Sequence, residues 1–144
     1  MNQNNASLGL SIIPALVIGI FYEFFLGHRH DYTGHFAAGY GGTYAFFMMG
    51  LRLIPDERYS HWGMICLVPG SLVCIAIGIF TEATIFRIAK FDEIDFFNQS
   101  LGAVLAAMAV LPFVDGQKPS NRTFDYGIIV AIVFLSLGGC FAVA

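Results

Sequence analysis

Five long apolar stretches, separated by short polar segments, make up most of this 144-residue chain. They run over residues 8–26, 35–54, 62–86, 96–114 and 126–144. A helix needs about 20 apolar residues to cross the ~30 Å of hydrocarbon in a bilayer, and each stretch is close to that length. Because a backbone in lipid must satisfy its own hydrogen bonds, helices are expected. The pattern predicts an all-α membrane bundle of about five transmembrane helices with short loops, in one domain over residues 1–144.

The composition also favours a bilayer over water as the main solvent. Charged residues make up 12% of the chain, against about 25% in a typical soluble domain, and the mean hydropathy is +0.71. The net charge of −3, without a basic tail, argues against nucleic acid as a partner. The Lys and Arg residues divide four to three between the two sides, so the orientation stays open. We expect an integral protein of a bacterial inner (plasma) membrane.

Polar residues gather around the first and third loops. Two spans separate these loops, so both lie on one side of the membrane in either orientation. Acidic groups inside a bilayer cost about 2.5–3.5 kcal/mol at a helix centre and usually pair within the bundle. Glu23, near the end of the first span, could pair with a His or Arg of the first loop, and Glu82 lies near the end of the third span. Either carboxylate could instead extend to the membrane–water interface.

Helical spacing places several of these polar residues on common faces. Asp95, Asn98 and Gln99 recur at i, i+3 and i+4 at the start of the fourth span. His35 shares a face of the second span with Gly39, where the absent side chain allows another helix to come close. We therefore predict one polar site beneath one membrane face. Its candidate ligand-binding residues are Asp31, His35, Glu82, Asp95, Asn98 and Gln99.

The histidines of the first loop raise the question of a metal site. His28, His30 and His35, with Asp31, are residue types that bind zinc or a similar divalent ion. Their spacing matches no strong metal-binding signature, and His28 and His30 diverge on a helix. Histidines close together in a loop are more often surface or hydrogen-bonding groups. We expect no cofactor, with a metal as the lesser alternative.

Residues Asp31 to Ala103 resemble the VanZ-like family of small membrane proteins. Asp31-Tyr32-Thr33-Gly34-His35 looks like that family's Asp-x-x-x-His element, and Glu82 looks like its acidic position. Asp95 to Gly102 is similar to its Asp-x-x-x-Asn-x-x-Gly element, although Gln99 stands where the family has Asn. A family Gln after the Glu and an Arg before the last Asp are not matched in register. One member is associated with low-level teicoplanin resistance, so the resemblance implies an envelope-related or lipid-headgroup role.

Three functions from different classes remain open. The first is a VanZ-like protein that binds a polar or lipid headgroup through His35, Glu82, Asp95 and Gln99. The second is a structural or accessory subunit of a larger membrane complex, with Gly138-Gly139 as a close helix contact. The third is a hydrolase acting on a lipid-linked substrate with His35 as general base, similar at a distance to membrane-bound metal-dependent hydrolases with a His-Arg-x-x-Thr-His run. No nucleophile stands in a recognisable setting, so an enzyme ranks last and catalytic residues stay unassigned. The expected partners are membrane lipid and, under the second function, other membrane subunits.

Overall fold

The computed structural model describes residues 3–84 and 92–142, apart from the side chains of residues 3–7, 82 and 142. Within these residues the chain forms helices and no strands. The long helices are α1 (Gln3–Phe25), α2 (His30–Leu53), α3 (Tyr59–Thr84), α4 (Glu93–Val114) and α5 (Asn121–Ala142), with a short 3-10 helix, η1 (Asp56–Arg58), before α3. The predicted all-α bundle is confirmed.

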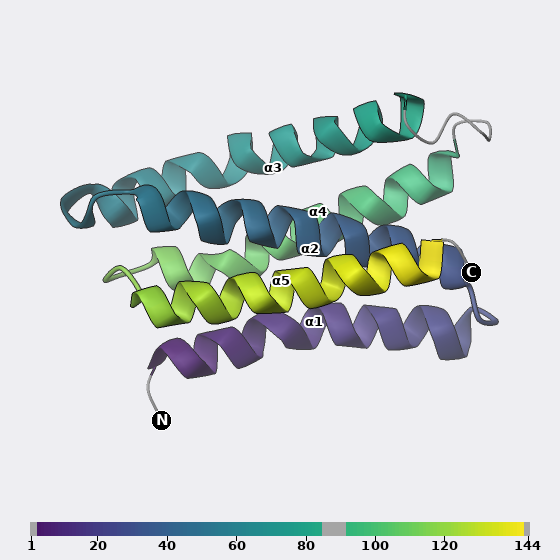
Figure 1. Cartoon of the computed structure of the whole chain (residues 1–144), viewed down its shortest axis with the longest axis horizontal. Coiled ribbons are helices and arrows are strands. Elements are labelled where there is room, and N and C mark those ends of the chain that lie inside the picture. Colours follow the sequence, from purple (N-terminus) through teal and green to yellow (C-terminus); the bar gives the residue numbers. More distant parts are fainter. Residues whose placement is uncertain (1–2, 85–91, 143–144) are drawn as a thin grey trace.

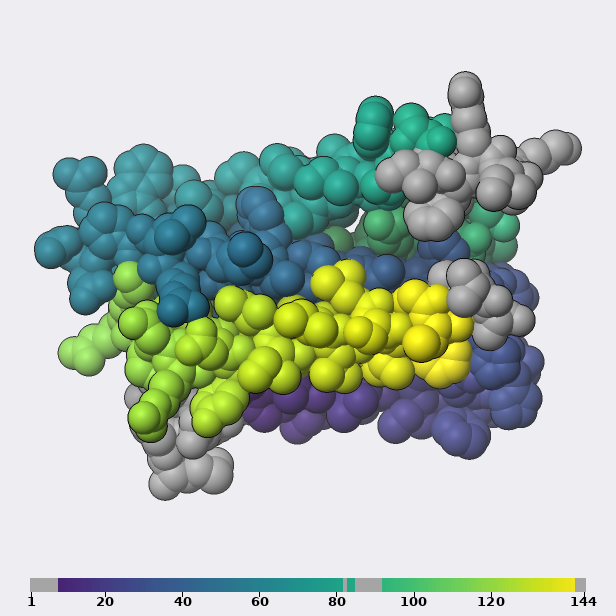
Figure 2. Space-filling view, viewed as in Figure 1, coloured from purple at the N-terminus to yellow at the C-terminus, as the bar shows by residue number. Residues whose placement is uncertain are grey.

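The helices lie side by side along the long axis of the molecule, and helices consecutive in the chain run in opposite directions (Figure 1). Helix α2 is central and packs against each of the other four long helices. Helices α1 and α3 lie at opposite edges of the bundle (Figure 1). Helix α5 forms the near face in Figure 2, where half of the surface of Ile129, Ile132 and Val133 is exposed. The apolar outer surface and the central α2 fit a bundle surrounded by lipid.

Within the described part of the chain, four helices are long and apolar enough to cross a membrane. They cover Leu8–Phe25, Asp56–Thr81, Glu93–Val114 and Asn121–Phe141. Helix α2, the predicted second span, is less hydrophobic than these four. It nevertheless connects the end of α1 to the start of α3 at the opposite end of the bundle (Figure 1), and its 24 residues extend about 36 Å. Helix α2 is less hydrophobic because it is surrounded by other helices, whereas the outer helices are in contact with lipid.

Each helix begins three to five residues before the apolar stretch predicted for it. The largest consequence is at the first loop, which is shorter than expected. Gly27 (φ 76°) and His28 (φ 60°) reverse the chain in left-handed conformations, and α2 begins at His30. Asp31 then lies in the first turn, where a carboxylate is favoured by the helix dipole. Thr33 and Asp31 are therefore helical residues, not loop residues.

Small residues bring α2 unusually close to two neighbours. A Cβ atom on Gly39 would overlap the backbone of Gln99 on α4, and one on Gly102 would overlap the backbone of Phe36 on α2. On the other side of α2, a Cβ on Gly138 of α5 would lie 2.8 Å from the backbone nitrogen of Ala38. The predicted close approaches at Gly39 and Gly138 are confirmed. Gly139 has open space around it, so the close contact involves only the first glycine of that pair.

We expect Gly102→Ala to destabilise the bundle, because the added methyl group forces α2 and α4 apart. Overpacking of this kind costs roughly 1–3 kcal/mol. The matched control is Gly50→Ala on α2, where the added Cβ meets nothing within 4 Å. That control should be neutral or stabilising by up to about 1 kcal/mol, since alanine is the better helix former. Thermal unfolding in detergent measures both, and equal stability of the two variants would contradict the packing argument.

Candidate functional site

The polar residues of the predicted site lie at one end of the bundle, where α1 and α3 end and α2 and α4 begin (Figure 1). The helix ends that flank the first and third loops thus lie together, as the alternation of spans predicts. The opposite end carries a different set of charged contacts. There Arg52 bonds Asp125 at 2.7 Å, and Lys118 lies 3.2 Å from Asp56. These pairs are separate from the predicted site.

A histidine–carboxylate pair joins the first two turns of α2 to the first turn of α4. His35 Nε2 lies 3.4 Å from Asp95 Oδ2, and about a fifth of each side chain is exposed. Asp92 positions Asp95 by capping α4: its carboxylate accepts hydrogen bonds from the backbone amides of Ile94 (2.8 Å) and Asp95 (3.4 Å). The His35–Asp95 distance is longer than that of a short charge-assisted bond, about 2.7–2.9 Å. Both groups therefore keep capacity to bond a third partner.

A cavity of about 280 Å³ lies between α2, α3 and α4, one helical turn farther into the bundle than this pair. Gly39 stands four residues after His35, and Gln99 stands four residues after Asp95, so the cavity continues the same helix faces. The Gln99 amide packs against Gly78 of α3, where a Cβ would lie 2.5 Å from Nε2. The remaining wall is mostly apolar. Its other lining residues are Ala38, Gly42, Thr43, Phe46, Cys74, Ile75, Ile77 and Ala103.

Asn98 belongs to a different contact. It is buried, and its Oδ1 accepts a hydrogen bond from the Tyr22 hydroxyl of α1 at 2.7 Å. Its Nδ2 has no hydrogen-bond partner within the described part of the chain. Asn98 thus joins α4 to α1 and does not line the cavity that Gln99 lines. Asn98 and Gln99 were expected on one face of α4, but Asn98 contacts α1 and Gln99 contacts α3.

Asp31 does not join the His35–Asp95 pair. Asp31 accepts two hydrogen bonds from Arg29, at 3.0 and 3.2 Å, and both side chains are about half exposed. The bond to Asp31 raises the pKa of Arg29, whose guanidinium also lies 3.7 Å above the Tyr32 ring. Asp31 is therefore engaged in a surface ion pair. Glu82 lies in α3, but its side chain is outside the described residues.

The three histidines of the metal hypothesis separate into different contacts. His30 Nδ1 lies 2.9 Å from Glu23 Oε2, which confirms the expected pairing of Glu23 with the first loop. His35 faces Asp95 instead, and the rings of His28 and His30 are 6.2 Å apart. In residues 3–84 and 92–142, no group of three or more His, Cys, Asp or Glu residues is arranged to hold a metal ion.

Sequence reasoning did not anticipate the part played by Tyr22 and Thr33. The Thr33 hydroxyl donates to Glu23 Oε1 at 2.6 Å, so Glu23 accepts from two residues of α2. The sequence gives little sign of either hydrogen bond. Thr33 was assigned to a loop, and a tyrosine in an apolar helix looks like a packing residue. The start of α2 at His30 places Thr33 on the face towards α1.

Comparison with known proteins yields no relative: no protein-family model, curated protein or solved structure matches the chain. The resemblance to the VanZ-like family therefore stays a hypothesis based on the short motifs quoted above. The class of protein that the fold defines is a helical membrane protein, with a His–Asp pair and a small cavity near one end of the bundle.

We expect Tyr22→Phe to lower the free energy of unfolding by roughly 0.6–1 kcal/mol, the usual value of one interhelical or buried hydrogen bond. The ring and its packing are kept, while Asn98 Oδ1 loses its donor. Tyr126→Phe is the control, because Tyr126 is 56% exposed on α5. Equilibrium unfolding in mixed detergents measures both variants. An unchanged Tyr22→Phe protein would mean that this bond contributes nothing to α1–α4 association.

Proposed function

We propose that this protein binds the polar headgroup of a lipid or lipid-like amphiphile at one membrane face, in an envelope-related, VanZ-like role in a bacterial inner membrane. The observation that carries the proposal is the partly exposed His35–Asp95 pair, one helical turn from a cavity that contains the Gln99 amide. A polar pair and, one helical turn farther into the bundle, a mostly apolar cavity match the two parts of an amphiphile.

The chemistry of these three side chains suits a hydrogen-bonding headgroup. A carboxylate accepts, an imidazole both donates and accepts, and a primary amide offers two donors and an acceptor. At the edge of a membrane such groups meet less competing water, so each bond to a ligand is stronger than in bulk solvent. Phe46 and Ile77 in the cavity wall are about half exposed, which gives an acyl chain access from the bilayer.

A purely structural role explains this pair less well. Helices α2 and α4 are already held together by the backbone contacts at Gly39 and Gly102. A pair retained only to join them would be expected to lie deep in that interface at short range. The His35–Asp95 pair instead lies at the end of the bundle, with both side chains partly exposed.

An enzymatic role has less support, because the two hydroxyls near the site, those of Thr33 and Ser100, are not placed for attack. The Thr33 hydroxyl already donates to Glu23, on the opposite side of α2 from His35. The Ser100 hydroxyl is buried and has no hydrogen-bond partner in the described part of the chain. A nucleophile needs an adjacent base, and neither residue bonds His35 or Asp95.

We expect Asp95→Asn and His35→Ala each to weaken headgroup binding at least tenfold, equivalent to about 1.4 kcal/mol. The probes are phosphatidylethanolamine and phosphatidylglycerol, titrated onto purified protein in detergent and followed by native mass spectrometry and thermal stability. The matched control is Asp125→Asn, which removes an exposed carboxylate that pairs with Arg52 at the other end of the bundle.

Wild-type affinity for both lipids in both site variants would exclude the His35–Asp95 site. A stoichiometric protein partner that copurifies with the wild type and is lost from both variants would favour the accessory-subunit function instead. Turnover of a lipid-linked substrate, lost on His35→Ala, would favour the hydrolase.

A further inference from the structure

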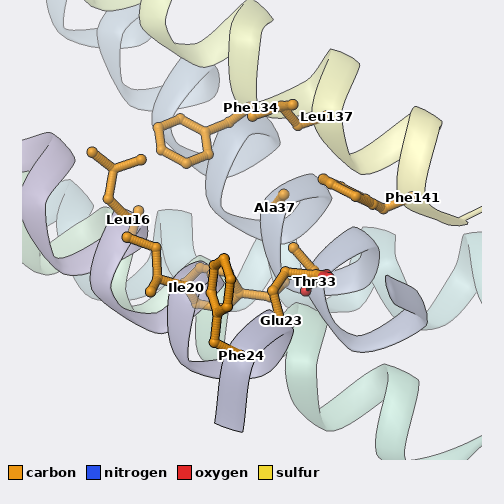
Figure 3. A pocket seen from close by; sticks show the side chains of 12 residues that line it. Leu16, Ile20, Glu23, Phe24, Thr33, Ala37, Phe134, Leu137 and Phe141 are labelled. Carbon is orange, nitrogen blue, oxygen red and sulfur yellow. Dashed lines mark hydrogen bonds between the residues drawn. The ribbon is translucent and has the colours of Figure 1, made fainter. Parts of the chain in front are cut away.

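A second cavity, of about 180 Å³, lies on the other side of α2, between α1, α2 and α5 (Figure 3). Its wall is apolar except at one end, where Glu23 and Thr33 contribute the polar groups. Leu16 and Ile20 of α1 are about half exposed, and Phe24 is 73% exposed. The cavity therefore opens towards the lipid around the bundle.

Two residues of α2, one of them backed by α5, hold the Glu23 carboxylate at the end of this cavity. Oε1 accepts the Thr33 hydroxyl at 2.6 Å, and Oε2 lies 2.9 Å from His30 Nδ1. The His30 ring stacks on Phe141 of α5 with the rings 5.7 Å apart and nearly parallel. Glu23 is only 17% exposed, so its position is set by these contacts and not by free movement in water.

The Glu23 carboxylate keeps bonding capacity. A carboxylate has about four acceptor positions, and Thr33 and His30 each contact one of its oxygens. The nearby cation Arg29 is bound by Asp31. A charge in a partly dehydrated setting favours a paired cation.

We propose that this cavity is a second binding site, for a bilayer-borne amphiphile with a protonated amine headgroup. The ammonium would bond the free acceptor positions of Glu23, and the adjoining alkyl segment would occupy the apolar part between Leu16 and Phe134. An apolar protein cavity of about 150 Å³ accommodates benzene, so this volume is sufficient for a short alkyl segment. An anionic headgroup would face the Glu23 carboxylate and be repelled.

This site is independent of the His35–Asp95 site. Thr33 and His35 are two residues apart on α2, which places them roughly 200° apart around the helix. Thr33 faces α1, and His35 faces α4. The two sites therefore have separate polar groups and separate cavities, and each can be disabled alone.

The test is the thermal stability of the full-length protein in phosphatidylcholine nanodiscs titrated with dodecylamine, with dodecanol as the uncharged probe of equal length. We expect dodecylamine to raise the unfolding temperature and dodecanol to have a much smaller effect. Glu23→Gln should reduce dodecylamine affinity at least tenfold. The control, Glu57→Gln, removes an exposed carboxylate at the opposite end of the bundle and should bind like the wild type.

A second variant tests the cavity without touching the charge. Gly19 lines the cavity, and a Cβ there meets nothing within 4 Å, so Gly19→Leu starts from an unobstructed position and places a bulky side chain at the cavity. We expect it to lose dodecylamine binding while Asp95→Asn keeps it. Equal binding of dodecanol, or wild-type dodecylamine binding by both Glu23→Gln and Gly19→Leu, would overturn the inference. Binding lost in Asp95→Asn but kept in Glu23→Gln would assign the amine to the first site and also overturn it.

Discussion

The close backbone approach of α2 to α4 and α5 is the contact on which the rest of the bundle depends. Lipid tails are as apolar as the helix surfaces, so burial of apolar groups does little to drive helices together in a bilayer. Close packing of helices at small residues drives their association instead. Gly39 and Gly102 allow α2 and α4 to touch, and Gly41 and Gly138 do the same for α2 and α5.

The central position of α2 explains its unusual composition. Its buried face carries the large polar aromatics Tyr40 and Tyr44, which are fully buried. The Tyr44 hydroxyl lies 2.9 Å from Ser11 Oγ, and the Tyr40 hydroxyl donates to the Ser11 carbonyl of α1. These tyrosines lower the hydropathy of α2, but their hydroxyls find hydrogen-bond partners on a neighbouring helix. Apolar composition therefore identifies the four lipid-facing helices better than the one in the middle.

The same central position divides the polar residues at the end of the bundle. Side chains on one face of the first turns of α2 meet α4, and those on the opposite face meet α1 and α5. One polar end thus becomes two small sites: His35 with Asp95, and Glu23 with His30 and Thr33. Glu23 and Thr33 line one cavity, and the His35–Asp95 pair lies one helical turn from the other.

The sequence by itself determined the helical membrane class, the approximate spans and the common side of the first and third loops. These follow from apolar length and strict alternation across the membrane. For Glu23 it left two alternatives, a partner in the first loop or the membrane–water interface. Only the tertiary structure decided that Asn98 bonds Tyr22 while Gln99 lines a cavity beside α3. Successive helix residues point about 100° apart, so periodicity places both on one broad face. Which neighbouring helix each side chain meets depends on how the helices are arranged around α2, and local spacing carries no information about that.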